Sequence, residues 1–302
     1  MEYIVETKNL TKRFGKECAV AGINMHIRKG EIYGFLGMNG AGKTTTIRML
    51  LGLMKPTFGS VQIFNQDLNK ERISILQRVG SLVENPSYYP HLTAVENLEA
   101  LRKIVNVPKS RIDEVLELVR LTDAANKKVK GFSLGMKQRL GIAAALLHEP
   151  ELIILDEPTN GLDPSGIIEM RNLIKSLPDY GITVLISSHL LSEIDQIATT
   201  VGVVSKGELI FQDSIEAMRR LSNEKIRLRV SEPKQAWQTL LGYGMKVELS
   251  EGVVHLQEQS EQQVADAVSA LVNNDFSVYR VEEEKRSLED IFLEMTTEGG
   301  ER

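Results

Sequence analysis

The feature that most constrains this chain is a glycine-rich segment that directly follows an apolar run. Residues 31–36 are expected to form a strand, residues 37–44 read GMNGAGKT, and a helix is expected near residues 42–51. The string matches G-x-x-x-x-G-K-[ST], and its place between a strand and a helix is the context in which this pattern binds phosphate. The N–H groups of such a loop and the N-terminus of its helix form a concave positive site. The segment therefore predicts an α/β fold built around a phosphate site.

The residues of this loop have distinct expected roles. Lys43 would reach the β- and γ-phosphates of a nucleotide, and the Thr44 hydroxyl would ligate Mg²⁺. A glycine-rich turn with a solvated lysine is the alternative, but it leaves the motifs described below unexplained. We assign the following residues to nucleotide binding: Gly37, Asn39, Gly40, Ala41, Gly42, Lys43, Thr44 and Thr45.

A second motif is a pair of carboxylates directly after a buried strand. Residues 152–157 read LIILDE, so Asp156 and Glu157 follow four apolar residues. Because charges are not buried without partners, this end of the strand should open onto a site. Asp156 suits the acid that completes Mg²⁺ coordination. Glu157 is then placed to orient the attacking water and partly deprotonate it.

The pattern along the chain predicts a parallel sheet covered by helices, followed by a second domain. Continuous apolar runs at 152–155 and 182–186 are typical of strands buried on both faces. Between them and the phosphate loop, residues 93–120 have a helical period that Pro108 should interrupt. After residue 221, strands and helices follow in the order β-α-β-β-α-β, with a last helix near 288–295.

Charge supports the same division. Residues 221–302 hold 16 acidic and 9 basic side chains, whereas the first 220 residues carry a small positive excess. We therefore predict one domain over residues 1–220 and an acidic α+β domain over residues 221–302. A net charge of −5 argues against a general nucleic-acid binder, and the single cysteine excludes a disulfide scaffold. No signal peptide and no apolar run of about 18 residues is visible in the sequence.

The order and spacing of the motifs resemble the nucleotide-binding subunit of an ABC transporter over residues 1–220. Between the two motifs above lies FSLGMKQR at 132–139, and NGLD at 160–163 and SH at 188–189 follow. A closer resemblance is to the bacitracin-resistance and lantibiotic self-protection ATPases, on the form SLGMKQR, a glutamate at position 84, and the ending SLEDIFL at 287–293. The resemblance implies a P-loop ATPase fold with a mixed core sheet and a helical subdomain.

The resemblance also implies roles for residues outside the first two motifs. His189 would contact the γ-phosphate and hold the attacking water. Ser133 and Gly135 would reach the ATP held by another subunit, so the active unit would be a head-to-tail dimer. Capping of a helix by Ser133 is the structural alternative. Asp163 precedes Pro164 and could cap a helix as well as cross to the partner subunit.

Several positions depart from the wider family. Leu134 and Met136 replace a glycine and a glutamine of the signature. Phe14 stands where an aromatic ring stacks on adenine, although it could equally belong to the core. Glu84 stands where most relatives have glutamine, and its charge would lie near Mg²⁺. The loop at 85–90 contains two tyrosines. It suits contact with a cytoplasmic helix of a membrane subunit, or its tyrosines are simply packed within the domain.

The resulting hypothesis is an ATPase that drives an exporter of an antimicrobial peptide or a similar amphipathic compound. It implies ATP and Mg²⁺ as cofactors, a separate transmembrane permease, a homodimer, no nucleic acid, and a peripheral place at the cytoplasmic face of the membrane. A nucleotide-gated sensor with slow hydrolysis is the alternative function. Soluble ABC proteins that act on ribosomes or DNA usually carry two ATPase halves, whereas this sequence has one, so that class is disfavoured.

A serine hydrolase is also disfavoured. The string GFSLG at 131–135 spells the nucleophile elbow of such enzymes but follows a polar, basic stretch rather than a strand.

Overall fold

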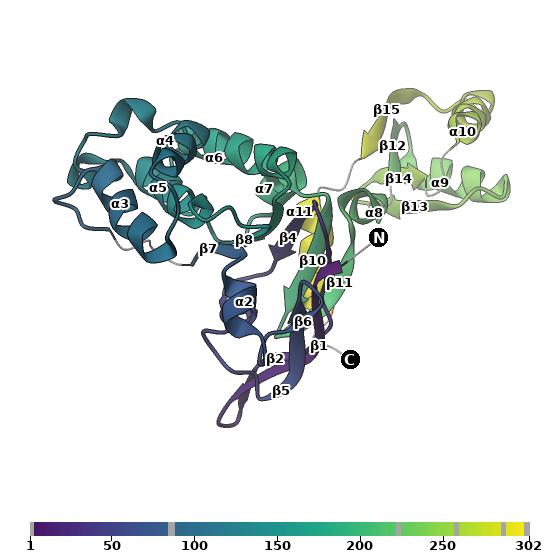
Figure 1. Ribbon diagram of the computed structural model, residues 1–302. Coiled ribbons are helices and arrows are strands. Elements are labelled where there is room, and N and C mark those ends of the chain that lie inside the picture. Colours follow the sequence, from purple (N-terminus) through teal and green to yellow (C-terminus); the bar gives the residue numbers. More distant parts are fainter. Residues whose placement is uncertain (1–2, 84–87, 222–224, 257–259, 285–287, 299–302) are drawn as a thin grey trace. The chain divides into compact units, whose positions relative to one another are not determined.

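The computed structural model describes residues 3–83, 88–221, 225–256, 260–284 and 288–298 (Figure 1). These residues form two compact units, one comprising Met1–Ile215 with Met295–Arg302 and the other Glu216–Glu294. Every described helix is too short or too polar to cross a lipid bilayer.

The main sheet of the first unit has six strands in the order β11-β10-β4-β9-β8-β7. Four neighbouring pairs are parallel, and β11 pairs with β10 in the antiparallel direction. Every residue of β8 and β9 is buried, as the apolar runs predicted. The strands are β4 (Ile32–Leu36), β7 (Val79–Leu82), β8 (Leu152–Asp156), β9 (Thr183–Ser188), β10 (Thr200–Ser205) and β11 (Glu208–Ser214).

A second, antiparallel sheet packs against the first. It contains β1 (Tyr3–Phe14), β2 (Glu17–Ile23), β3 (His26–Arg28), β5 (Phe58–Ile63) and β6 (Gln66–Asp67). One apolar cluster joins the two sheets and α1, with Leu10, Phe35, Ile47 and Ile63 among its buried members. This shared core holds the loop between β4 and α1 at the junction of the two sheets.

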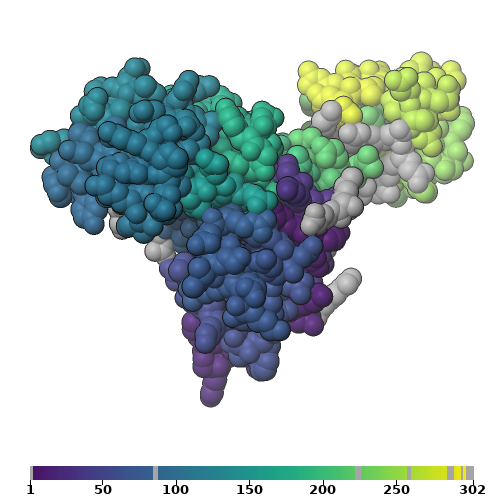
Figure 2. Space-filling view, in the orientation of Figure 1, coloured from purple at the N-terminus to yellow at the C-terminus, as the bar shows by residue number. Residues whose placement is uncertain are grey.

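Helices cover the main sheet and extend into a separate layer. The helices α3, α4 and α5 pack on one another, and the space-filling view shows them as a continuous lobe in blue and teal (Figure 2). The predicted break at Pro108 is confirmed, because α3 ends at Val105 and α4 begins at Ser110. The helices of this unit are α1 (Lys43–Leu50), α2 (Arg72–Leu76), α3 (Ala94–Val105), α4 (Ser110–Leu118), α5 (Leu134–Leu146), α6 (Pro164–Ser176) and α7 (Leu191–Ile197), with 3₁₀ turns at Thr122–Ala124, Val129–Gly131 and Leu177–Tyr180.

The second unit is a four-stranded antiparallel sheet, in the order β13-β14-β12-β15, with two helices packed on it. Its core contains Leu228, Leu240, Val254 and Leu271. The observed order of elements is the β-α-β-β-α-β order expected from the sequence. The elements are β12 (Lys225–Val230), α9 (Pro233–Gly242), β13 (Val247–Ser250), β14 (Val253–Leu256), α10 (Glu261–Asn273) and β15 (Val278–Glu284), with α8 (Ile215–Arg220) before them and α11 (Leu288–Glu298) after them.

Candidate active site

The phosphate loop lies between β4 and α1, and backbone contacts hold both of its ends. The N–H of Gly37 donates to the carbonyl oxygen of Ser188 at 3.3 Å, and the N–H of Gly207 donates to that of Ala41 at 3.0 Å. Gly42 has a φ of +105°, and a Cβ at this position would lie 2.5 Å from the carbonyl oxygen of Ala19. Only glycine fits both this backbone conformation and this space.

The outer side of the loop leaves the start of α1 open to an anion. Asn39 and Gly40 are exposed, and Thr44 and Thr45 are half-buried. No hydrogen bond from a described side chain caps α1, and its first turn contains no acidic residue. The unpaired N–H groups and the helix dipole therefore favour negative charge at this end.

Lys43 is buried beneath the loop and connects it to the carboxylate pair. Its Nζ donates to the carbonyl oxygen of Gly37 at 2.6 Å and lies 3.2 Å from Oε1 of Glu157. Only 6% of the Lys43 side chain is exposed, so the ammonium group works in a partly desolvated setting, where its attraction to an anion is strengthened.

Three neighbouring strands bring the predicted residues to one edge of the sheet. The parallel registers pair Leu36 with Ser188 and Asp156 with Ser187. Because parallel strands end at the same edge, the phosphate loop, the carboxylate pair and His189 are adjacent there, which is where α/β sheets bind their ligands.

A serine from β9 holds both members of the carboxylate pair. The hydroxyl of Ser187 donates to Oδ1 of Asp156 at 2.6 Å and accepts from the N–H of Glu157 at 2.9 Å. Asp156 is buried, with 6% exposure. Glu157 has a φ of +49°, in the left-handed region, which costs a non-glycine residue about 1 kcal/mol. The hydrogen bond from its N–H to Ser187 helps to keep this strained backbone in place.

The carboxylate of Glu157 joins two other predicted groups. Oε1 lies near Lys43, while Oε2 lies 2.7 Å from Nδ1 of His189. A cation for phosphate, a carboxylate able to accept a proton, and an imidazole therefore converge within hydrogen-bonding distance. This combination suits hydrolysis of a phosphoanhydride by an activated water.

The oxygen donors beside this cluster fit Mg²⁺. Asp156 contributes a buried carboxylate and Thr44 a half-buried hydroxyl, and hard oxygen atoms of this kind are preferred by the ion. Within the described residues, no group of three or more His, Cys, Asp or Glu side chains could hold a metal by itself. Mg²⁺ is commonly held by one or two carboxylates together with nucleotide phosphates, and the residues present fit that mode.

The signature residues begin α5, and the capping alternative is confirmed for Ser133. Its hydroxyl accepts from the N–H of Met136 at 3.2 Å. Ser133 remains exposed, Gly135 is half-buried, and the side chain of Leu134 is 42% exposed. The turn therefore presents an apolar side chain between the two residues assigned to ATP.

Asp163 caps α6, and this helix begins with Pro164 as the sequence predicted. The carboxylate accepts from the Ser165 hydroxyl at 2.9 Å and from the Gly166 N–H at 3.1 Å. These two hydrogen bonds, the first more than the second, lower the pKa of Asp163.

The remaining predicted positions have different outcomes. The alternative that Phe14 belongs to the core is wrong, because its side chain is 49% exposed and Nζ of Lys12 lies 5.3 Å from the centroid of its ring. Glu84 lies outside the described residues. Of the two tyrosines after it, Tyr88 is packed and donates to the carbonyl oxygen of Lys137 at 2.6 Å, and burial raises its pKa. Tyr89 is 60% exposed.

Sequence reasoning missed three buried polar residues at this edge of the sheet: Ser187, Thr159 and Glu193. Ser187 lies at the end of a strand, Thr159 in a loop and Glu193 on a short helix. Polar side chains at such places are ordinarily expected to be exposed to solvent. Only the pairing of β8 with β9 places them together.

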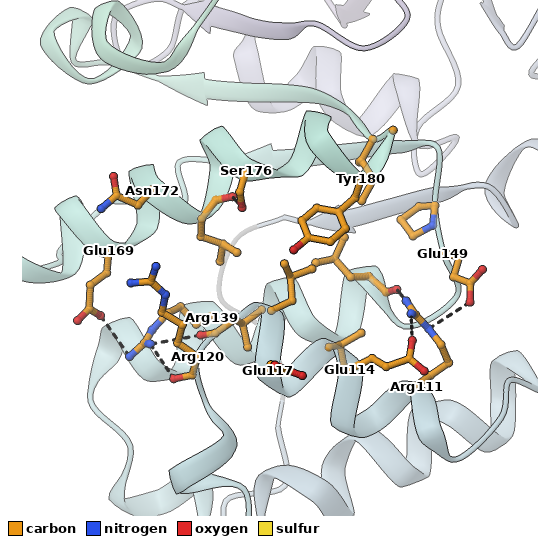
Figure 3. Close-up of a pocket in the computed structure, with 18 of the residues that line it drawn as sticks. Arg111, Glu114, Glu117, Arg120, Arg139, Glu149, Glu169, Asn172, Ser176 and Tyr180 are labelled. Atoms are coloured by element: carbon orange, nitrogen blue, oxygen red, sulfur yellow. Dashed lines mark hydrogen bonds and ion pairs between the residues drawn. The ribbon is translucent and has the colours of Figure 1, made fainter.

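A cavity of about 900 Å³ lies elsewhere, between α4, α5 and α6 (Figure 3). Two of the arginines that line it are paired: Arg111 with Glu114 and Glu149, and Arg139 with Glu169. None of the predicted site residues is among those that line it in the described structure. The predicted site residues lie at the strand ends instead.

Comparison with known proteins agrees with this geometry. Residues 20–160 match the family described as ABC transporter. The bacitracin transport ATP-binding protein BcrA of Bacillus licheniformis is 45% identical over 98% of this chain and 98% of its own. The lantibiotic transport ATP-binding protein SrtF of Streptococcus pyogenes is 40% identical over 74% of this chain and 97% of its own.

Solved structures show the same fold. The dimeric post-hydrolysis state of an ATP-binding cassette bound to ADP and Pi has a TM-score of 0.62 and 28% identity, over 70% of this chain and 98% of that chain.

Proposed function

Since this chain belongs to the ATP-binding subunits of ABC transporters, we propose that it powers the export of an antimicrobial peptide or a similar amphipathic compound. ATP hydrolysis coupled to transport is the activity of the family. The near full-length similarity to a bacitracin transport ATP-binding protein supports the substrate class. The observation that carries the catalytic assignment is the convergence of Lys43, Glu157 and His189 beside the phosphate loop.

In this proposal the groups at the strand ends divide the work of binding and hydrolysis. Lys43 and the loop N–H groups bind the phosphates, and Glu157 orients the attacking water and accepts its proton. His189 fixes the Glu157 carboxylate and contacts the γ-phosphate. Thr44 and Asp156, with Glu84, would hold Mg²⁺, which neutralises charge on the phosphates when it is bound.

The working unit in this proposal is a homodimer. Ser133, Gly135 and Asp163 would face the nucleotide of the second subunit, and the exposure of Ser133 supports this role. The cassette bound to ADP and Pi is dimeric, which is a precedent for the fold.

The proposed membrane partner is a separate permease that meets α3 and the segment beside it. Tyr89, Leu101 and Ile104 expose 60%, 40% and 79% of their side chains there. Exposed apolar side chains on α3 and just before it favour a protein contact, and a permease contact would hold the chain at the cytoplasmic face of the membrane.

The alternative is a sensor that binds ATP and hydrolyses it slowly. The exposed Leu134 favours it, because an apolar side chain replaces a small residue beside the proposed γ-phosphate contact.

One experiment separates the two functions. The tagged chain is purified from membranes with whatever co-purifies, and its ATPase rate is measured in lipid vesicles with and without added antimicrobial peptide. An exporter turns over continuously, copurifies with a permease and confers resistance that Glu157→Gln removes. A sensor shows slow turnover that the peptide leaves unchanged, with resistance that survives Glu157→Gln.

A further inference from the structure

We propose that Glu193 is a positioning residue for hydrolysis, because its buried carboxyl links the segment after Glu157 to the strand end before His189. Glu193 lies on α7, four residues after His189, and is 7% exposed. The inference rests on the proposed roles of Glu157 and His189.

The contacts of Glu193 reach both sides of the site. The Thr159 hydroxyl donates a hydrogen bond to Oε2 of Glu193. The Ser188 hydroxyl lies 3.4 Å from the same oxygen and 3.3 Å from the carbonyl oxygen of Leu190, and it accepts from the N–H of Leu190 at 3.0 Å. Thr159 and Ser188 are themselves buried, with 5% and 1% exposure. A hydrogen-bonded chain therefore runs through the interior from the loop after β8 to the end of β9.

Packing alone does not explain a carboxyl at this place. Across the described part of the chain, no lysine, arginine or histidine forms an ion pair with Glu193. A buried carboxyl without a cation is costly to desolvate, and an apolar side chain of similar volume would avoid that penalty. What the carboxyl adds is a fixed geometry between its two hydroxyl partners.

The hydrogen bonds of Glu193 complement those of Ser187. Ser187 binds the N–H of Glu157 and the carboxylate of Asp156, so it holds the backbone at the start of the loop. Glu193 binds Thr159, two residues further on, so it holds the loop on the other side of Glu157. With both anchors in place, the strained backbone of Glu157 keeps its carboxylate against His189. Misplacement of a reacting group by about 1 Å lowers a rate by about a hundredfold.

The test compares three variants with a control on the same helix. Glu193→Ala removes the acceptor, Thr159→Val removes only the donor hydroxyl, and Glu193→Gln keeps an acceptor oxygen. Ser192→Ala, at an exposed position of α7, is the control. Glu193→Ala and Thr159→Val should lower kcat for ATP by about tenfold to a hundredfold, with KM changed by less than about threefold. Glu193→Gln should recover part of kcat, and Ser192→Ala should match the parent.

Two further measurements separate positioning from folding. Combining Glu193→Ala with Thr159→Val should lower kcat no further than the stronger single change, because both break one interaction. In a Glu157→Gln background, Glu193→Ala should still form the dimer held together by ATP, because nucleotide binding does not depend on the hydrogen bonds of Glu193. Unfolding midpoints confirm that each variant is folded.

A folded Thr159→Val with parental kcat, an effect on KM alone, or additive losses in the double variant would each overturn the proposal. If Glu193→Ala does not fold, Thr159→Val decides the question. Failure of the proposed function is distinct, since Glu157→Gln would then hydrolyse ATP at the parental rate.

Discussion

Oε2 of Glu157 lies 2.7 Å from Nδ1 of His189, although 32 residues separate them along the chain. The two side chains follow adjacent parallel strands, and the other oxygen of Glu157 lies 3.2 Å from Nζ of Lys43. One carboxylate thus contacts both the group proposed to bind phosphate and the imidazole proposed to sense it. A change at any of the three residues should alter hydrolysis more than folding.

Lys43→Ala should reduce ATP hydrolysis by about a hundredfold or more, because it removes a charge-assisted contact to the phosphates. Lys29→Ala is a matched control, since Lys29 is an exposed lysine that pairs with Glu151 away from the site. Steady-state phosphate release measures both. A Lys43→Ala protein that turns over at the parental rate would show that the loop has another role.

Glu157→Gln should bind ATP without cleaving it, because the amide keeps the shape of the side chain but cannot accept the proton. Two ATP molecules shared between phosphate loops and opposite Ser133–Gly135 turns would then hold two subunits together. Size-exclusion chromatography with MgATP should show the variant as a dimer and the parent as a monomer. A variant that stays monomeric at saturating ATP contradicts the shared site.

Ser187→Ala should lower kcat and destabilise the fold by about 1–3 kcal/mol, because it leaves the Glu157 N–H without its partner. The carboxylate of Asp156 loses a hydrogen bond at the same time. Ser187→Thr keeps the hydroxyl and should retain more of both activity and stability. The measurements are kcat and the free energy of unfolding in urea. Equal values for Ser187→Ala and the parent would exclude the role of Ser187 as an anchor for the strained backbone.

The central part of the fold could be predicted because its strands are continuously apolar. The predicted runs at 152–155 and 182–186 became β8 and β9, and the glycine-rich turn follows β4 as expected. The antiparallel sheet of β1, β2 and β3 was not predicted. The pairing of β1 with β5 shifts register between Lys8 and Thr11, and such irregularity breaks the alternation by which a half-buried strand is recognised.

The residues at the candidate site also differ in how far the sequence could predict them. Residues with a motif, such as Lys43 and Glu157, could be identified because their spacing along the chain carries the chemistry. Ser187, Thr159 and Glu193 could not, because their role depends on which strands lie side by side. A single sequence does not reveal that β8 pairs with β9 rather than with another strand.

The capping carboxylate of Asp163 should make a pH-dependent contribution to stability. Hydrogen bonds from Ser165 and Gly166 lower its pKa in the folded state. The contribution is therefore complete above the pKa of the unfolded chain, near 4, and is lost as the pH falls toward the folded pKa. The difference in unfolding midpoint between the parent and Asp163→Ala should narrow below about pH 4. Asp163→Asn keeps a capping group that does not titrate, so its difference from Asp163→Ala should stay constant with pH.

Glu84 is the predicted site residue at which the chain departs most from the wider family. A hard divalent ion prefers a charged carboxylate to a neutral amide, so a negative oxygen near Mg²⁺ should strengthen Mg²⁺ binding and lower the Mg²⁺ concentration that hydrolysis requires. Glu84→Gln restores the commoner residue and should bind ATP and retain some turnover, with a higher Mg²⁺ requirement. Glu84→Ala leaves no acceptor and should impair both metal use and transport.

Mg²⁺ titrations of the ATPase rate for the parent, Glu84→Gln and Glu84→Ala decide between a metal ligand and a solvated loop residue. Nucleotide affinity measured without Mg²⁺ is the control, because a residue that acts only through the metal leaves it unchanged. A ligand shifts the titration midpoint upward in the order parent, Gln, Ala, since each step removes part of the negative oxygen's attraction for the ion. Superimposable curves, with resistance in cells unchanged, would leave Glu84 without a role at the site.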